Sequence, residues 1–252
     1  STQGVLSAAS DVYKRQVAKL DEIRQTVVAT SQVPLYVNDP VAVTAEGTPV
    51  RIVRNAETNL GDLCADAYRA LSNADIAFVN GGGIRKQIEA GDITLDDIYS
   101  VHPFGNTMCV IRVTGQQVLD ALEWGARAVP SENGGFLQVS GLTYEIHTGV
   151  ASSAEKDENG MFTRVSGEYR VKNVMVGGQP LELDKTYTLA SHNYMLLGHG
   201  DGYTMFDGCE VLGEDMMVDN QVLITYITTT LGGVVGEQYA NPYGDGRIVA
   251  VE

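Results

Sequence analysis

The sequence has few of the residues that build metal sites and activated nucleophiles. Its 252 residues include only four histidines, His102, His147, His192 and His199, with no His-x-His or His-Glu-x-x-His spacing. A two-metal hydrolase needs several close histidine and carboxylate ligands to hold its ions and activate water. The Gly-x-Ser-x-Gly pattern of a serine-hydrolase elbow is also missing. We therefore expect no catalytic residue, no metal ligand and no cofactor in this chain.

Cysteines and long apolar runs are also scarce. The three cysteines, Cys64, Cys109 and Cys209, are widely spaced and form no Cys-x-x-Cys pair, which argues against a zinc site. Their apolar or strand-like settings predict buried free thiols, with a single disulfide left open as the alternative. No run approaches the roughly 20 apolar residues that cross a bilayer, so we expect no membrane insertion. No signal peptide is visible, and because Ser1 is not an initiator residue we expect a processed or cut chain.

Positive charge is in short supply as well. Lysine and arginine total 17 against 32 aspartates and glutamates, giving a net charge of −15. A field of that sign repels nucleic-acid backbones and anionic membranes, so neither is an expected partner. Solubility of an exported protein is the ordinary explanation of such a charge. A cluster of arginines in such a chain is more informative, because its positive charge opposes the negative field of the whole chain.

The sequence does contain a mixed series of helical and strand patterns. Helices are predicted over residues 11–28, 59–71, 114–128 and 219–231, and strands over 75–80, 108–113, 142–147, 168–176, 181–183, 186–191 and 247–251. Because strands and helices do not alternate regularly, the fold class expected is α+β rather than a doubly wound sheet. We expect one domain over residues 33–252, preceded by an N-terminal helical arm over residues 1–32. Packing of the arm on the domain is the expected arrangement, with a connection to another domain as the alternative.

Local signals mark several boundaries. Asn59 is the expected N-cap of the second helix, and Thr114-Gly-Gln-Gln117 fits a capping box at the start of the third. Gly177-Gly178 indicates a hairpin between two strands. The polar segment 151–160 is expected to be a mobile loop.

Glycine-rich turns beside polar and aromatic residues are the candidates for a binding site. In Asn80-Gly81-Gly82-Gly83-Ile84-Arg85, the glycines allow a ligand to approach the backbone and the guanidinium can fork onto phosphate. A tight turn with a surface arginine explains this motif equally well. Phe104 lies in a turn before a strand, where an aromatic ring is more often a lid of the core than a stacking platform. Asp201, in a glycine-rich loop, has the ordinary role of capping its own backbone.

Taken together, five segments resemble a known family. They are Arg54-Asn-Ala-Glu-Thr-Asn59-Leu-Gly-Asp-Leu63, Asn80-Gly-Gly-Gly-Ile-Arg85, Pro103-Phe-Gly-Asn106, Phe136-Leu-Gln-Val-Ser-Gly141 and Gly200-Asp-Gly-Tyr203. Their order is that of the C-terminal domain of the 5′-nucleotidase family, which includes UDP-sugar hydrolases and 2′,3′-cyclic-nucleotide phosphodiesterase/3′-nucleotidases. The resemblance covers about residues 33–251, and the arm looks like the helix that joins this domain to its partner domain.

The resemblance implies a role for individual residues. Arg54 and Arg85 are expected to hold phosphate, and Asn80 and Asp201 to bind the nucleoside portion. Phe104 and Tyr194 are expected to stack on the two faces of the base, with Asn106 at its edge. The segment between Tyr194 and Asp201 is one residue longer than in relatives, which makes Tyr203 the competitor for the second stacking position.

The resemblance also implies a division of labour. A metallophosphatase domain N-terminal to this one would carry two divalent metal ions and hydrolyse the ester, while this chain, inactive alone, binds a nucleotide or nucleoside. Such a protein is expected to be extracellular, periplasmic or associated with the cell wall. Two alternatives stay open: a stand-alone nucleotide-binding module without hydrolysis, and a structural domain of a cell-surface protein.

Overall fold

A mixed sheet at the centre of the body organises the fold. The computed structural model describes the backbone of residues 2–252 and the side chains from residue 13 onward. Five strands lie in the order β12 (Glu210–Gly213), β4 (Met108–Thr114), β11 (Thr186–His192), β2 (Ile76–Asn80) and β5 (Leu137–Ser140). Only β11 and β2 run parallel among these neighbours, and the other pairs are antiparallel. This arrangement confirms the predicted α+β class.

The parallel pair determines where a binding site can form. Leu189 pairs with Ile76 and Ala190 with Ala77, so both strands end at the same edge of the sheet. Asn80 is the last residue of β2 and His192 the last residue of β11. Two segments far apart in the sequence therefore leave the sheet side by side.

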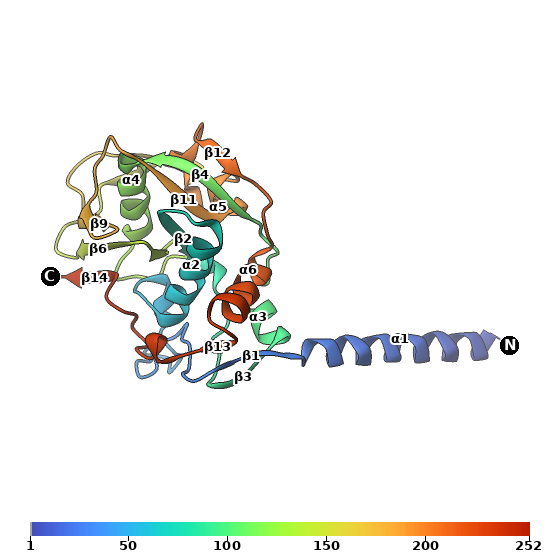
Figure 1. Ribbon diagram of the computed structural model, residues 1–252. Helices are drawn as coiled ribbons and strands as arrows, with labels where there is room; N and C mark the ends of the chain where they lie inside the picture. Colours follow the sequence, from blue (N-terminus) through green and yellow to red (C-terminus); the bar gives the residue numbers. More distant parts are fainter. Residues whose placement is uncertain (1) are drawn as a thin grey trace.

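Helices cover both faces of this sheet, as Figure 1 shows. Along β2, Ala77 and Val79 belong to the core beneath α2 (Asn59–Ser72) and α6 (Asp219–Thr225). Ile76 and Phe78 belong to the second core, beneath α4 (Gly115–Ala126). This alternation follows from the two-residue period of a strand, and it explains why all five residues of β2 are buried.

Three smaller sheets and two short helices complete the described elements. They are β10 (Gln179–Pro180), β9 (Val171–Val176), β6 (Leu142–His147) and β14 (Ile248–Val251); β13 (Val234–Val235), β1 (Val27–Ser31) and β3 (Gly91–Thr94); β7 (Ala154–Lys156) and β8 (Phe162–Val165); and the helices α3 (Leu95–Val101) and α5 (Asn193–Leu196). No helix among the described residues is long and apolar enough to cross a membrane.

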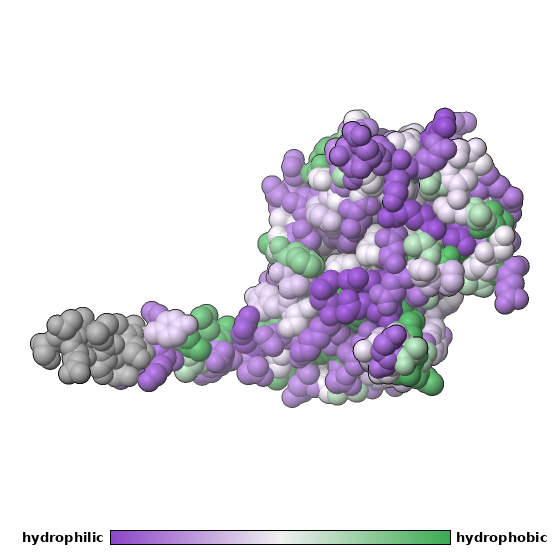
Figure 2. Space-filling model, turned by 180° about the vertical axis from the view of Figure 1, so that it is seen from behind, coloured by the Kyte–Doolittle hydropathy of each residue, from purple (hydrophilic) through white to green (hydrophobic). Residues whose placement is uncertain are grey.

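The N-terminal arm is a helix that projects from the body. Helix α1 (Thr2–Arg24) extends away from the sheets in Figure 1, and in Figure 2 its coloured part carries both hydrophilic and hydrophobic side chains. From Tyr13 to Arg24 every side chain is exposed, including Leu20 at 61%. Packing on the domain was therefore the wrong expectation for this part of the helix. The predicted helix also ended too late, because residues 27–31 form β1 and pair with β3 and β13.

The start of α2 differs from the prediction by one residue. Thr58 is the N-cap, and its hydroxyl accepts a hydrogen bond from the Gly61 amide at 3.0 Å. Asn59 instead uses its side chain for long-range bonds: Oδ1 accepts from the Tyr36 amide, and Nδ2 donates to the carbonyls of Pro34 and Tyr239. Both residue types are good caps, but only the Thr58 side chain has no long-range hydrogen bond and can cap the helix. The capping box at Thr114 and Gln117 is confirmed.

Two further predictions were wrong in the C-terminal half. The segment 151–160, expected to be a loop, contains β7, which pairs with β8. Its polar composition reflects an exposed hairpin whose buried Phe162 packs edge-on against Trp124 at 5.7 Å between ring centroids. The strand expected at 181–183 lies earlier, at β10. The residues that pair with β9 after the Gly177-Gly178 turn are Gln179 and Pro180.

The last predicted helix is present but changes its pitch. It begins as α6 at Asp219 and continues as a π-helix over Tyr226–Thr230. The three cysteines are free, with Cys64 and Cys109 buried and Cys209 partly buried, in agreement with the expected thiols.

Candidate functional site

A cleft of about 410 Å³ opens at the edge where β2 and β11 end. Its walls include all seven residues selected from the sequence: Arg54, Asn80, Arg85, Phe104, Asn106, Tyr194 and Asp201. The remaining lining residues are Gly82, Gly83 and Gly134. Six separate segments of the chain thus meet at one opening, at the carboxyl ends of strands, where ligands of α/β proteins commonly bind.

Glycines allow these segments to approach one another. The Gly82 amide donates a hydrogen bond to the Gly134 carbonyl at 2.7 Å. A Cβ at Gly82 would lie 2.9 Å from that same oxygen, and a Cβ at Gly81 would overlap the carbonyl of Val53. The close approach explains the glycine run after β2, because any side chain there would push the Arg54 turn away from the strand end.

Two arginines give the cleft a cationic side. Arg54 lies at the end of a 3₁₀ turn (Ile52–Arg54), and its Nε atom is buried without a hydrogen-bond partner among the described residues. Burial lowers the pKa of Arg54, and the nearby positive charges of Arg51 and Arg85 lower it further. Arg85 is exposed and donates one hydrogen bond, from Nη1 to the Gly82 carbonyl at 3.4 Å.

Neither arginine forms an ion pair with a carboxylate among the described residues, although the charges of Glu132 and Asp201 raise the pKa of Arg54. In the part of the chain that the structure describes, the arginine ion pairs involve Arg24, Arg112, Arg164 and Arg247, not Arg54 or Arg85. Two guanidiniums close together repel each other, and an anion bound between them would relieve that repulsion. In a chain with a net charge of −15, this side of the cleft is suited to an anionic group.

Two aromatic rings also line the cleft. Phe104, in the loop between α3 and β4, is 60% exposed, and Tyr194, in α5, is 43% exposed. The Tyr194 hydroxyl donates to Asp201 Oδ1 at 3.2 Å, while a Cβ at Gly200 would overlap the tyrosine ring. Gly200 therefore provides the room in which this ring lies. Exposed rings of this kind expose flat apolar surfaces suited to a planar ligand.

Tyr203, the competitor for the second stacking position, lies in the core. Its side chain has no exposed surface, and its hydroxyl donates to the Gly135 carbonyl at 2.5 Å. Its ring stacks on Phe206 with 6.2 Å between centroids. Of the two tyrosines, only Tyr194 lines the cleft.

The polar wall is a chain of hydrogen bonds. Asn80 Nδ2 donates to Asp201 Oδ2 at 2.6 Å, and Asn80 Oδ1 lies 2.9 Å from Nε2 of the buried His192. Asp201 has a left-handed backbone, with φ of 56°, which aspartate tolerates better than most residues. Trp124 Nε1 donates to the Asp201 carbonyl at 2.9 Å and holds this conformation.

Asn106 is fixed by its backbone. Its amide donates to Asp219 Oδ2 at 3.1 Å, and its carbonyl accepts from the Asp219 amide at 2.8 Å. Burial raises the pKa of Asp219 to about 6, although its hydrogen bonds oppose the shift. No hydrogen bond of the Asn106 side chain is found within the described residues, so this amide is available to a ligand in the cleft.

Two residues at the site carried no sequence signal of their own. His192 was one of four scattered histidines, and Gly134 belonged to no recognised motif. The position of His192 at the end of a predicted strand, two residues before Tyr194, was the available clue. Gly134 could only have been found from its contact with Gly82.

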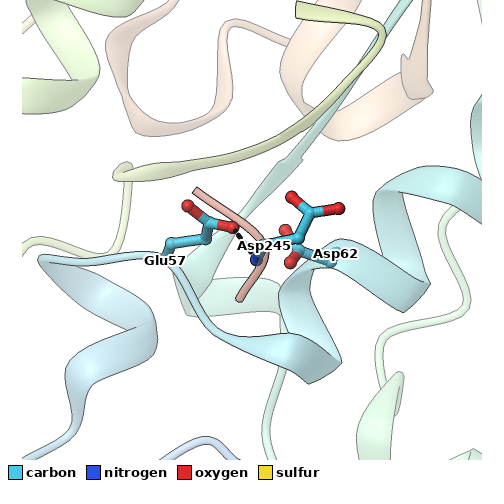
Figure 3. Close-up of side chains that lie close together, drawn as sticks. All are labelled: Glu57, Asp62 and Asp245. Atoms are coloured by element: carbon cyan, nitrogen blue, oxygen red, sulfur yellow. Dashed lines mark hydrogen bonds between the residues drawn. The ribbon is translucent and has the colours of Figure 1, made fainter. Parts of the chain in front are cut away.

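A second cluster of polar groups lies away from the cleft, around Glu57, Asp62 and Asp245 (Figure 3). One ligand atom from each of these side chains lies within 4.8 Å of the others. Asp245 is already paired with Arg247, at 2.9 Å from Nε to Oδ1, and Arg247 also bonds both oxygens of Asp66. A guanidinium thus supplies the positive charge of this cluster.

Glu57 is likewise satisfied by the protein. Its carboxylate accepts hydrogen bonds from the backbone amides of Asp245, Gly246 and Ile248, at 2.6 to 3.0 Å. Asp62 differs, because its buried Oδ1 has no hydrogen-bond partner, although Arg247 Nε lies 3.5 Å away. Burial raises the pKa of Asp62 to about 9, and the charge of Arg247 opposes the shift. We interpret the cluster as a structural tie between the start of α2 and the segment leading into β14.

The fold and the cleft together define a class: an α+β domain with a small-molecule cleft lined by two arginines and two aromatic rings. Residues 27–208 match the family model described as "5'-nucleotidase, C-terminal domain". The chain belongs to this family.

Relatives and solved structures agree with that assignment. The chain is 36% identical to a trifunctional nucleotide phosphoesterase of Bacillus subtilis, over 79% of this chain and 13% of the relative. It is 34% identical to a 5′-nucleotidase of Vibrio cholerae, over 70% of this chain and 28% of the relative. The structure of a Thermus thermophilus 5′-nucleotidase precursor superposes with a TM-score of 0.75 at 29% identity, covering 97% of this chain and 43% of that one. This chain therefore corresponds to the C-terminal domain of larger proteins.

Proposed function

We propose that this chain is the nucleotide-recognition domain of a nucleotidase or cyclic-nucleotide phosphodiesterase. The observation that carries the proposal is the pair of arginines, Arg54 and Arg85, that line one cleft and form no ion pair with a carboxylate among the described residues. Phosphate is bound well by such guanidiniums. The base would lie between Phe104 and Tyr194, and the ribose would contact the polar wall.

The remaining groups fit the same ligand. Asp201 offers carboxylate oxygens to ribose hydroxyls, with Asn80 beside it. Asn106 would contact the edge of the base. The proposed nucleotide-binding domain extends over residues 33–252, with residues 1–32 as an arm and interdomain linker.

Hydrolysis would belong to a metallophosphatase domain N-terminal to this one, holding two divalent metal ions. The recognition domain would raise the rate by holding the ester in position against that centre. A protein of this kind would work outside the cytoplasm, in the extracellular, periplasmic or cell-wall compartment. The word "precursor" in the name of the Thermus thermophilus relative supports this placement.

The test is direct binding to the 252-residue chain. A chemical-shift titration with AMP, adenosine and inorganic phosphate should show AMP binding most tightly, with shifts at Arg54, Arg85, Phe104 and Tyr194. Shifts scattered over the surface, or none at millimolar AMP, would favour a structural domain that has lost the pocket.

A further inference from the structure

His192 is a buried group behind the cleft with an unexplained arrangement. Its side chain is 3% exposed and lines no part of the cleft, yet Nε2 lies 2.9 Å from Asn80 Oδ1. The other ring nitrogen, Nδ1, is buried with no hydrogen-bond partner in the described part of the chain. A single contact thus accounts for all the hydrogen bonding of this ring.

In the series of hydrogen bonds Asp201–Asn80–His192, only one assignment of donors and acceptors is possible. A carboxylate only accepts, so the atom of Asn80 that lies 2.6 Å from Asp201 Oδ2 must be the amide nitrogen. The amide oxygen then faces His192, and Nε2 must carry the proton that it accepts. The ring is neutral because burial, and then the proximity of His102, lower the pKa of His192 to about 3.

The arrangement has a consequence for the ligand. If the Asn80 amide turned over, its oxygen would face the Asp201 carboxylate and repel it. With the observed orientation, Asn80 holds Oδ2 and Tyr194 holds Oδ1, at 2.6 and 3.2 Å. The lone pairs that remain on Asp201 can accept only from donors in the cleft, which the hydroxyls of a sugar supply.

We propose that His192 is a positioning residue that locks the Asn80 amide and so makes the cleft select ligands with free ribose hydroxyls over their deoxy counterparts. The inference rests on the proposed nucleotide-binding function and adds that the sugar of the ligand must carry free hydroxyls. It assigns the selection to a side chain that does not touch the ligand. The room for the contact comes from Gly83, where a Cβ would lie 2.6 Å from Asn80 Oδ1.

The first experiment compares adenosine with 2′,3′-dideoxyadenosine as ligands of the 252-residue chain. The unmodified protein should prefer adenosine, and His192→Leu should reduce that preference by about tenfold or more, the scale of one hydrogen bond to a charged group. His192→Gln retains an N–H donor and should therefore keep part of the preference for adenosine. Tyr68→Phe is the matched control, because the Tyr68 ring lies 6.4 Å from the His192 ring and its hydroxyl has no partner among the described residues. Equal losses of both ligands in His192→Leu would overturn the proposal.

The second experiment needs no ligand and no variant. Nitrogen-15 shifts of the His192 ring should show a neutral imidazole protonated at Nε2 throughout pH 5 to 8. A ring protonated at Nδ1, or one that titrates in this range, would overturn the positioning role. Absence of adenosine binding to the unmodified chain would instead reject the nucleotide-binding function, so the two failures are distinguishable.

Discussion

The guanidinium carbon of Arg85 lies 5.8 Å from the centroid of the Phe104 ring. One arginine of the proposed phosphate site therefore sits over an aromatic face proposed to stack on the base. A cation–π contact of this kind contributes about 0.5–1 kcal/mol at an exposed position. In the proposed complex, the base would replace this contact on Phe104, and the phosphate would bind the Arg85 guanidinium.

The aromatic walls give the first prediction. Phe104→Ala and Tyr194→Ala should each weaken adenosine binding by about 1–3 kcal/mol, the scale of lost base stacking. Tyr203→Phe is the control, because Tyr203 lies in the core and its ring is kept. Titration calorimetry or chemical shifts would measure all three. Unchanged adenosine binding in Tyr194→Ala would show that Tyr194 is not the second stacking residue.

The arginines give the second prediction. Arg54→Ala and Arg85→Ala should each weaken AMP by about 1.5–3 kcal/mol while changing adenosine little, since charge-assisted bonds to phosphate are lost. The loss should shrink at high ionic strength, because partly exposed charges are screened. Arg112→Ala is the matched control, because Arg112 is an exposed residue of the otherwise largely buried strand β4 and is paired with Glu210. Equal losses of AMP and adenosine would mean that Arg54 and Arg85 support the fold instead.

The third prediction concerns Asp62 and pH. Because the pKa of Asp62 is raised to about 9 in the folded chain, the folded state holds a proton that the unfolded state has released above pH 4. Its contribution to the free energy of unfolding is therefore fully present at low pH and falls by about 1.4 kcal/mol per pH unit until pH 9. Asp62→Asn cannot ionise, so its stability relative to the unmodified chain should rise from pH 5 to pH 9. A difference in unfolding free energy between Asp62→Asn and the unmodified chain that stays constant from pH 5 to pH 9 would contradict a buried protonated Asp62.

The fourth prediction concerns activity. Adding Mn²⁺, Co²⁺ or Zn²⁺ to the purified chain should release no phosphate from AMP, UDP-glucose or cyclic nucleotides, because the proposed catalytic centre belongs to another domain. A phosphate-release assay would check this, with a complete two-domain relative as the positive control. Metal-dependent turnover by the 252-residue chain would reject the proposed division of labour.

The sequence predicted elements best where local signals and tertiary contacts agree. The capping box at Thr114 and the buried strand ending at Asn80 were both found, since each is encoded within a few residues. Asn59 was misassigned as a cap because its partners, Tyr36, Pro34 and Tyr239, are distant in the sequence. The exposed hairpin at β7 and β8 was missed because polar edge strands and loops have similar compositions.

The residues of the site could be named from the resemblance, but their arrangement in space could not be predicted from the sequence. That Arg85 lies near enough to lower the pKa of Arg54 follows only from the close approach of the glycine run to Val53 and Gly134. Likewise, the role of Tyr194 rather than Tyr203 depends on which ring is buried, and both follow strand β11 closely. The contact between His192 and Asn80 joins residues 112 positions apart, beyond the reach of local patterns.

The parallel pairing of β2 with β11 has a consequence for synthesis of the protein. A ribosome that has made β2 must add more than a hundred residues before its partner strand exists, since Ala77 pairs with Ala190. Such long-range pairing slows folding and leaves the central strand without its neighbour during translation. Until β11 emerges, only α2, α4 and β5 among these neighbours can cover β2, and the cleft cannot form. Any ligand that binds this cleft can therefore stabilise only the finished domain, which makes it a late and selective aid to folding.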